Sequence, residues 1–490
     1  MTDIQDTAGT DSAAGEPAAE PGAAAKPKIK LGVNYWKLWT ASVGSNLGDG
    51  VAAIAYPWLA SAITRDPILI ALIAVAQRIP WLVFTLPAGV ITDRVDRRKA
   101  MVWMDALRAG LTFVVAFAVL RAGSGLPTID EIAEGVPVST DQFLYWVLVL
   151  TAFLLGMAEV LRDNASQTIL PAIVEPDGLE KANGQMWGAE MVMNSFLGPV
   201  LGSLLLAAAF ALPFYFDAAT FALSAILVFL ITGDFRSAGA GEQSQKVEWR
   251  REIGEGFGWL WRHELLRPMA IILGIMNGVA AMSFATFVLF AQEVLGVNAF
   301  VFALLGTGGA MGGILGSVTA PKISERLGSG TSLYVTLIGG GITSIIVGLA
   351  THWSVAWVMF AAFTFTAVLW NVITVSLRQT IIPDRLLGRV NSVYRFFAWG
   401  MMPIGMLIGG LLVAGAEEVA SREVALRLPW IVGGITYGVL LIYAVPRLTT
   451  QKLEAARAEG IVAREALVAD EAVSAAVDPP VLDGGADSAG

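Results

Sequence analysis

The chain has 490 residues, of which 55% are hydrophobic and 15% charged, and its mean hydropathy is +0.65. A soluble globular core does not account for so apolar a composition, which is typical of a membrane protein. The sequence has no cysteine and two histidines, which excludes disulfides, a cysteine nucleophile and thiolate metal ligation. We therefore expect no enzyme activity, no metal site and no cofactor. The net charge of −9 comes largely from the two ends of the chain and therefore says little about a partner of the folded part. We expect no nucleic-acid partner.

Twelve stretches are long and apolar enough to cross a bilayer as helices, which takes roughly 20 residues each. They lie near residues 34–63, 68–92, 100–121, 142–163, 180–209, 212–233, 268–295, 299–320, 331–350, 354–377, 390–415 and 428–446. The spans of a β-barrel would be shorter and would alternate in hydropathy. The predicted fold class is therefore an all-α membrane protein with twelve transmembrane helices.

The polar stretch 234–267 divides the spans into two groups of six, at residues 34–233 and 268–446. The ends, residues 1–33 and 447–490, are rich in Ala, Gly, Asp and Glu, and we expect disordered or weakly helical tails. Within the central stretch, residues 247–262 mix aromatic and basic side chains at helical spacing. This pattern is typical of a helix that lies along the inner membrane surface, either as a tether between the halves or as a lipid sensor.

A short repeat indicates that the two groups of six spans arose by duplication. The sequence QTILP at residues 167–171, after the fourth span, reappears as QTIIP at residues 379–383, after the tenth. A weaker echo joins Gly89-x-x-Thr92 to Gly316-x-x-Thr319. Both repeats fall at equivalent ends of equivalent spans, as expected for two six-helix bundles related by an axis along the membrane normal.

The distribution of Lys and Arg predicts the orientation, because short basic loops stay on the cytoplasmic side. With the N-terminus inside, most basic residues of the connections fall on the inner side, and the outer connections hold only Arg65, Arg121, Arg422 and Arg427. We therefore expect a multi-pass protein of the plasma membrane with both termini in the cytoplasm.

The loop between the second and third spans carries a family resemblance. Its pattern Gly89-x-x-x-Asp93-Arg94-x-x-Arg97-Arg98, followed by Asp105-x-x-Arg108, resembles the signature of the major facilitator superfamily. With the span count and the central loop, the resemblance covers residues 34–446. Within that superfamily, several short motifs resemble the drug:proton antiporter branch that includes macrolide efflux proteins and enterobactin exporters: Pro171, Ala182-Asn183, Gly198-Pro199, Pro383 and Gly388-Arg389-Val390. The Arg-x-x-Gln-Gly pattern of many drug antiporters is replaced here by RDNASQ at residues 162–167. No proton-coupling role is therefore transferred to Arg162.

The same loop is a candidate gating latch. Gly89 allows the second span to approach a neighbouring helix, Asp93 can face the positive end of the eleventh span near residues 389–392, and Arg97 can pair with Asp163. Such contacts would close the inner side of the two bundles. The predicted latch residues are Gly89, Asp93, Arg94, Arg97, Arg98, Asp163 and Arg395. The alternative is that the charges serve only as a topology signal, and Arg395 can face either the latch or the central cavity.

Charged residues deep in a span are costly in the bilayer and are therefore functional candidates. Asp49 and Glu159 lie toward the middle of the first and fourth spans, and Glu190 lies nearer the inner end of the fifth. A carboxyl group in a low-dielectric cavity can exchange a proton near neutral pH, so these three are our candidate proton carriers. The alternative role is a structural ion pair with Arg78 or Arg108. We expect Asp105 and Arg108 to form an i,i+3 pair, and Asp217 to lie near the outer end of the sixth span.

The resemblance implies a substrate pocket at the midplane, lined by spans one, four, seven and ten. Aromatic, methionine and amide side chains there would form an adaptable wall for a bulky amphipathic ligand, although the same residue types also face lipid. The candidates are Tyr56, Trp58, Met157, Asn277, Phe284, Phe287, Trp370 and Asn371.

Together these features favour a monomeric secondary transporter that exchanges protons for a hydrophobic or amphipathic small molecule such as a drug, a siderophore or a natural product. The resemblance, rather than the residues, favours export. A membrane sensor or receptor that does not transport, or an uptake transporter, could use the same fold. No Gly-x-x-x-x-Gly-Lys-Ser/Thr phosphate loop occurs, so nothing supports a pump driven by ATP.

Overall fold

The computed structural model describes residues 31–127, 131–132, 138–233, 235 and 249–477, and every regular element in these ranges is a helix. In the N-terminal half, these are α1 (Gly32–Ile63), α2 (Pro67–Val83), α3 (Thr85–Arg94), α4 (Arg97–Ala122), α6 (Gln142–Ile173), α7 (Leu179–Val192), the π-helix η3 (Met193–Leu197), α8 (Gly198–Ala208) and α9 (Leu212–Phe229). Two short 3-10 turns, η1 (Gly123–Gly125) and η2 (Pro176–Gly178), complete this half.

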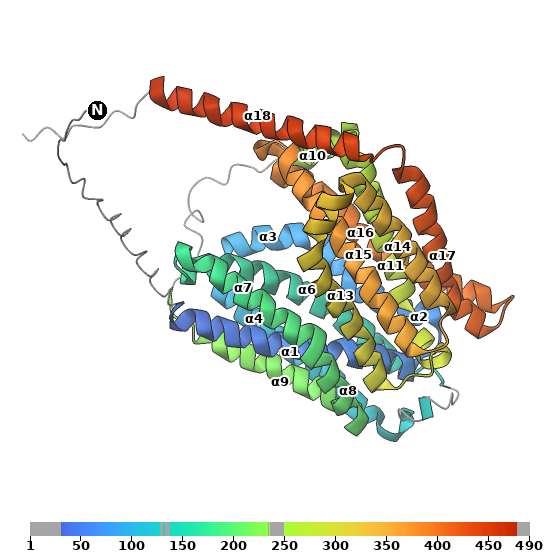
Figure 1. Cartoon of the computed structure of the whole chain (residues 1–490). Coiled ribbons are helices and arrows are strands. Elements are labelled where there is room, and N and C mark those ends of the chain that lie inside the picture. Colours follow the sequence, from blue (N-terminus) through green and yellow to red (C-terminus); the bar gives the residue numbers. More distant parts are fainter. Residues whose placement is uncertain (1–30, 128–130, 133–137, 234, 236–248, 478–490) are drawn as a thin grey trace, which may run out of the picture.

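In the C-terminal half, the elements are α11 (Leu266–Ala285), α12 (Phe287–Leu289), the π-helix η4 (Phe290–Val294), α13 (Ala299–Leu327), α14 (Ser329–Leu349), α15 (Trp353–Ile381), α16 (Asp384–Glu417) and α17 (Arg422–Ala444). Two further helices are α10 (Trp249–Arg262) and α18 (Thr450–Val477). The two halves form adjoining bundles, the first blue to green and the second yellow to orange-red in Figure 1. We call the face where α1 begins and α17 ends the terminal face, and the opposite one the distal face.

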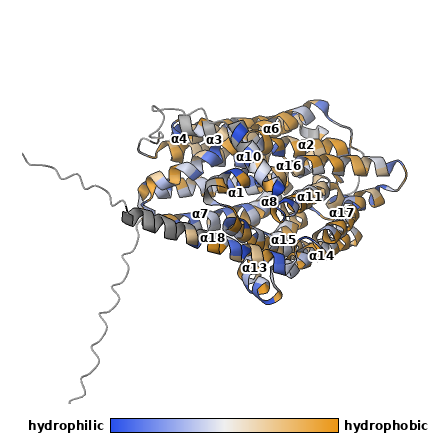
Figure 2. Cartoon of the chain, turned by 90° about the horizontal axis from the view of Figure 1, so that it is seen from above, coloured by the Kyte–Doolittle hydropathy of each residue, from blue (hydrophilic) through white to orange (hydrophobic). Residues whose placement is uncertain are grey.

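The predicted all-α membrane architecture is confirmed. In the described ranges, ten helices are long and apolar enough to cross a membrane, and α2 is a shorter apolar helix that α3 continues. With α1, which runs for 32 residues, they are consistent with the twelve predicted spans. The helices of both bundles consist largely of hydrophobic residues (Figure 2), and many large apolar side chains lie at the surface, such as Phe143 and Ile442, which are more than 70% exposed. A bilayer is the environment that such a surface requires.

Three spans that the sequence predicts as continuous helices are broken, and proline explains two of the breaks. The second span divides at Phe84, because Pro87 has no N–H group for the carbonyl of residue 83. The fifth span widens into η3 just before Pro199, where the Gly198 N–H bonds the Met193 carbonyl instead. The seventh span breaks at Thr286, where α11 ends and α12 begins.

The central aromatic and basic segment forms α10, which packs against α16 of the C-terminal half. Gly256 lies against the backbone of Arg389, and the rings of Phe257 and Trp261 stack with Phe397 at centroid distances of 6.3 and 6.1 Å. His263 caps the turn between α10 and α11, because its Nδ1 accepts hydrogen bonds from the N–H groups of residues 265 and 266. Burial lowers the pKa of His263, which favours the neutral imidazole that this cap requires.

The C-terminal tail is helical as far as Val477, which is the second of the two predicted alternatives. Thr450 Oγ1 accepts the N–H of Gly330 at 3.1 Å, Leu453 is buried, and Gly460 lies against the Thr380 carbonyl, so α18 packs on α14 and α15. It extends across the terminal face (Figure 1). The N-terminal tail and residues 478–490 lie outside the described residues.

The two repeated pentapeptides occupy the ends of α6 and α15. Thr168 Oγ1 bonds the Asn164 carbonyl at 2.9 Å, and Thr380 Oγ1 bonds the Ser376 carbonyl at 3.0 Å, so both threonines reach back four residues in the same way. This local equivalence supports a duplicated bundle.

The glycines of the eighth and eleventh spans serve close helix packing. Gly312 on α13 lies directly against the Ala361 carbonyl of α15, and Gly405 on α16 lies against the Gly278 carbonyl of α11. At both crossings the helix backbones touch without intervening side chains.

The substitution Gly312→Ala should therefore destabilise the C-terminal half, because a Cβ at that position would overlap the Ala361 carbonyl. We expect a loss of about 1–3 kcal/mol, measurable as a lower thermal unfolding midpoint of the purified protein. Gly306→Ala on the same helix is the control, because nothing lies within 4 Å of a Cβ there. Equal midpoints for the two variants would contradict the close crossing.

Candidate functional site

A buried arginine of α4 organises the interior of the N-terminal half. Arg108 is 3% exposed, and its Nη2 donates to Asp49 Oδ1 on α1 at 2.6 Å. Its Nη1 donates to Ser45 Oγ at 3.2 Å, and the guanidinium lies 3.8 Å from the ring centre of Phe221 on α9. One side chain thus joins three helices that are distant in sequence.

A second arginine extends this arrangement to α6. Asp105 is fully buried, accepts the Ser224 hydroxyl at 2.7 Å, and lies 3.7 Å from Arg108 Nη1 and 3.3 Å from Arg162 Nε. Arg162 also lies 3.7 Å from Asp163. The i,i+3 pair predicted from the sequence therefore exists, and it forms part of a larger network.

The structure brings the three candidate proton carriers to this network. Asp49 contacts Arg108 directly and its side chain remains 31% exposed. Glu159 on α6 is half-buried, and Asp49, Arg108 and Asp163 are among its charged neighbours. Glu190 on α7 is exposed, and Asp163, Asp49 and Arg162 are its charged neighbours. Arg78, which the sequence offered as a counter-ion, is exposed on α2 and is the remaining charged neighbour of Glu159.

Asp217 was missed as a member of this group. Asp217 does lie near the outer end of its span, as predicted, because α9 begins at Leu212. However, α9 crosses α1 at Gly48 there, so Asp217 is buried next to Asp49 and Arg108. Span prediction could not reveal this position, because it does not show where two helices cross.

Acidic groups outnumber basic ones in the network, which we call the N-half ionic cluster. Its members are Asp49, Asp105, Arg108, Glu159, Arg162, Asp163 and Asp217. Five carboxyl groups thus share two buried guanidinium groups. Because an ionised carboxylate without a counter-ion is costly at low dielectric, the arrangement favours carboxyl groups that retain protons.

The structure describes only some of the predicted latch. The backbone of α3 is described, but the side chains at Gly89, Asp93 and Arg94 lie outside the described residues. Arg97 Nη1 donates to the Thr168 carbonyl at 3.0 Å, and Arg98 Nη1 donates to the Ile231 carbonyl at 2.6 Å. Both contacts attach the start of α4 to its own half.

The predicted pair between Arg97 and Asp163 is absent in the described residues, because Asp163 lies next to Arg162 on its own helix. Arg395 is exposed on α16, which begins at Asp384 and so extends closer to the terminal face than predicted.

Polar contacts between the halves occur at the distal face, and the sequence did not predict them. Arg65, after α1, donates to Gln292 Oε1 on η4 at 2.5 Å and lies 3.6 Å from Glu293. Gln292 Nε2 in turn donates to the buried Ser61 hydroxyl of α1 at 3.0 Å. Arg422, at the start of α17, bonds Glu293 at 2.5 Å and the Arg65 carbonyl at 2.9 Å.

Glu417 completes this set by accepting Arg422 Nη1 at 2.7 Å. We call these six residues the distal lock: Ser61, Arg65, Gln292, Glu293, Glu417 and Arg422. One feature of the sequence pointed to these contacts: Arg65 and Arg422 are among the few basic residues of the outer connections.

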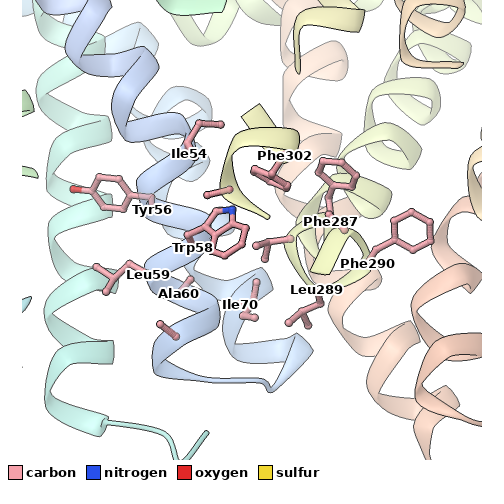
Figure 3. Packing of buried hydrophobic residues seen from close by; sticks show 14 of the residues in the cluster. Ile54, Tyr56, Trp58, Leu59, Ala60, Ile70, Phe287, Leu289, Phe290 and Phe302 are labelled. Atoms are coloured by element: carbon pink, nitrogen blue, oxygen red, sulfur yellow. The ribbon is translucent and has the colours of Figure 1, made fainter. Parts of the chain in front are cut away.

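Apolar packing closes the same end. Trp58 of α1 points at Phe302 of α13, with ring centroids 6.3 Å apart, and Phe287 stacks on Phe302 at 5.2 Å (Figure 3). These residues belong to one buried cluster drawn from both halves. The distal ends of the bundles are therefore joined by a hydrophobic seal beneath the polar lock.

The predicted substrate residues divide into two groups in this conformation. Tyr56, Trp58, Phe287 and Trp370 are buried in core clusters. Met157 and Asn277 are half-buried, and Phe284 and Asn371 are exposed. Asn277 donates to the Ala398 carbonyl at 2.7 Å and Asn371 to the Ala367 carbonyl at 3.1 Å.

A cavity inside the C-terminal half is too small for a substrate. It lies between α11, α14, α15 and α17, has a volume of about 10 Å³, and is lined in part by Ser283, Phe284 and Tyr437. That is room for one water molecule.

Comparison with known proteins agrees with this architecture. Residues 38–405 match the Major Facilitator Superfamily, so the chain belongs to this family of transporters, as the signature loop predicted. It is 24% identical over 407 residues to the multidrug efflux pump Tap of Mycolicibacterium fortuitum, covering 81% of this chain and 92% of that protein. It is 22% identical over 351 residues to the enterobactin exporter EntS of Citrobacter koseri, covering 70% and 77%.

The fold resembles the crystal structure of the nucleoside transporter NupG, with a TM-score of 0.63 at 11% identity, covering 85% of this chain and 99% of that one. The predicted resemblance to drug and siderophore efflux transporters is confirmed by Tap and EntS.

Arg108→Ala should destabilise the N-terminal half, because it leaves Asp49 and Asp105 without their shared cation. Removal of one partner of a buried ion pair costs about 3–5 kcal/mol, seen as a fall in the thermal unfolding midpoint. The double variant Arg108→Ala/Asp49→Asn should regain part of the loss, since it removes one unpaired charge. If both variants unfold at the wild-type temperature, Arg108 does not organise the cluster.

Proposed function

We propose that the protein exports hydrophobic or amphipathic small molecules across the plasma membrane in exchange for protons, by alternating access. The observation that carries this proposal is the N-half ionic cluster, in which five carboxyl groups share two buried arginines and the Asp49 side chain stays partly exposed. A cluster that holds exchangeable protons next to the contact between two bundles provides what proton-coupled transport requires. Its relatives Tap and EntS, named as an efflux pump and an exporter, support the direction.

The orientation belongs to the same proposal. Lys99, Lys181 and Lys322 lie at the terminal face, whereas the distal connections hold the four outer arginines of the sequence analysis. The positive-inside rule supports a cytoplasmic position for the terminal face, together with α10 and α18. The lock and the seal close the distal face, which supports assigning this conformation to the inward-facing state of the proposed monomeric transporter.

The cluster and the contact between halves are connected through η3. The carbonyls of Met193 and Asn194 lie against Gly50 of α1, next to Asp49, and η3 also packs against α13 of the other half. A single π-helical turn inside an α-helix is rare and frequently marks a functional site. A shift of α1 after a change of protonation would therefore reach α13 directly.

In the proposed transport cycle, the N-terminal half binds the proton and the C-terminal half contributes an apolar wall for the substrate. In the inward-facing state the cluster releases its proton to the cytoplasm, and the substrate enters between the bundles. Opening of the distal lock releases the substrate outside and admits a new proton to the cluster. The exposed Phe284, which contacts Phe360 and Trp430 through its ring, offers an apolar wall in the C-terminal half.

Glu159→Gln should abolish coupling to protons, because the amide binds no exchangeable proton. In vesicles of purified protein with an imposed pH gradient, we expect ethidium, an amphipathic cation, to move no faster than without a gradient, while passive exchange continues. Glu325→Gln, an exposed carboxyl on α13, is the matched control and should behave as wild type.

Gradient-driven movement by the Glu159→Gln variant would remove this residue from the coupling mechanism. A wild-type protein that moves none of a panel of drugs and siderophores would favour a receptor, and flux driven only inward would favour an uptake transporter.

Glu293→Gln should open the distal lock, because it weakens contacts with both Arg65 and Arg422. Each of these half-exposed ion pairs stabilises the closed distal face by about 1 kcal/mol. Their weakening should therefore raise the population of the outward-facing state several-fold. The natural chain lacks cysteine, so spin labels can be placed on Ser139→Cys/Val419→Cys at the distal face and on Asn183→Cys/Ser392→Cys at the terminal face.

We expect distances to lengthen for the distal pair and to shorten for the terminal pair. Arg427→Gln is the control, since Arg427 pairs with Glu423 within α17 and joins no second half. Unchanged distances in Glu293→Gln would show that these ion pairs do not hold the distal face closed.

A further inference from the structure

Asp217 of α9 is a buried carboxyl group of the N-half ionic cluster to which the proposed function gives no separate role. It is 2% exposed, its Oδ1 has no hydrogen-bond partner in the described residues, and it forms no ion pair there. Gly48 of α1 lies so close that a Cβ would overlap both the Asp217 carboxyl and the Thr220 hydroxyl. The crossing of α1 and α9 is thus shaped around this carboxyl group.

The guanidinium of Arg108 lies on the same side of α9. It is placed over Phe221, which follows Asp217 by one helical turn and therefore shares its face. The charged or titratable groups that face Asp217 are Asp49 and Tyr56 of α1 and Arg108 of α4. The third helix packed against α9 is α8, which contains no ionisable residue.

Besides Asp49 and Asp105, which lie 2.6 and 3.7 Å from its guanidinium, Arg108 has Asp217 in its surroundings but makes no ion pair with it in the described residues. Asp49 has the guanidinium at 2.6 Å and is partly exposed, whereas Asp217 is sealed and has no cation in contact. A sealed carboxylate without a counter-ion is costly, so this arrangement is consistent with a proton on Asp217 and an ionised Asp49.

We propose that Asp217 stores the coupling proton and is the alternative partner of Arg108. The proton passes from an Asp217 oxygen to an Asp49 oxygen, so one O–H bond breaks and one forms, and Arg108 keeps its own protons and moves to the newly ionised Asp217. Asp49, with its exposed side, then releases the proton to the open face. Uptake from the other face reverses the steps, and Arg108 is never left without a carboxylate.

This inference rests on the proposed exchange of protons for substrate, and the two can fail separately. The first readout needs no substrate: infrared spectroscopy of the purified protein detects the C=O stretch of protonated carboxyl groups. We expect part of this band at neutral pH to be missing in Asp217→Asn and to be present in Asp217→Glu and in the control Glu325→Gln.

Asp49→Asn gives the sharper test, because Asp217 is still present in that variant. Arg108 then has no carboxylate partner on α1. We expect its guanidinium to move to Asp217 and to stabilise the ionised form of that carboxyl group. The C=O band of protonated Asp217 should then disappear. The inference is overturned if the band keeps its wild-type size in Asp217→Asn, or if the part assigned to Asp217 persists in Asp49→Asn. This readout also keeps the proposal testable if Asp217→Asn does not fold.

The second readout is ethidium movement in vesicles. Asp217→Asn should keep passive exchange but lose gradient-driven movement and the pH dependence of the wild type, whereas Asp217→Glu should restore both. If wild type is driven by the gradient and Asp217→Asn has the same pH profile, only this inference fails. If wild type itself does not respond to the gradient, the proposed function fails, and the infrared result decides about Asp217 alone.

Discussion

A buried guanidinium group must keep a counter-charge in contact, and this constraint on Arg108 determines the layout of the N-terminal half. Arg108 forms an ion pair with Asp49 of α1 and shares Asp105 with Arg162 of α6. Its guanidinium also packs over the ring of Phe221 on α9. Four helices are therefore tied to one charge centre inside the membrane region, where an unpaired ion would be costly. Movement of any of these helices has to be accompanied by an exchange of partners within the cluster.

The two halves are related in topology but differ in chemistry. The charges buried in the middle of the described spans belong to the N-terminal half, whereas the C-terminal half is held by backbone contacts at glycines such as Gly312 and Gly405 and by the rings around Trp430. In the proposed transport cycle, the first arrangement responds to protons and the second offers an apolar surface. Under that proposal, one half senses the proton and the other accommodates an amphipathic ligand without charges in the ligand's path.

Much of the fold followed from the sequence because the bilayer makes hydropathy and length direct signals of a span. The high cost of a charge in lipid likewise identified Asp49, Glu159 and Glu190, which the structure brings together. Asp217 was missed because its depth was judged from the span end, and the crossing of α9 with Gly48 is a tertiary feature.

The distal lock was missed for a related reason. Its partners come from helix ends up to 357 positions apart in the chain, and no local pattern links Arg65 with Arg422. The helix break before Pro199, in contrast, follows from the missing proline N–H and was open to prediction.

The cluster and the lock lie on the same helix, and this connection explains how a proton could control a distant contact. Asp49 is at the middle of α1, and Ser61 of the lock lies twelve residues further along, roughly 18 Å at the rise of an α-helix. Pro57 lies between them and provides a point where the helix can bend. If Arg108 leaves Asp49, α1 loses its strongest tie to α4 and α9. The two contacts of its distal end, Ser61 with Gln292 and Arg65 with Glu293, are then free to separate from the C-terminal half.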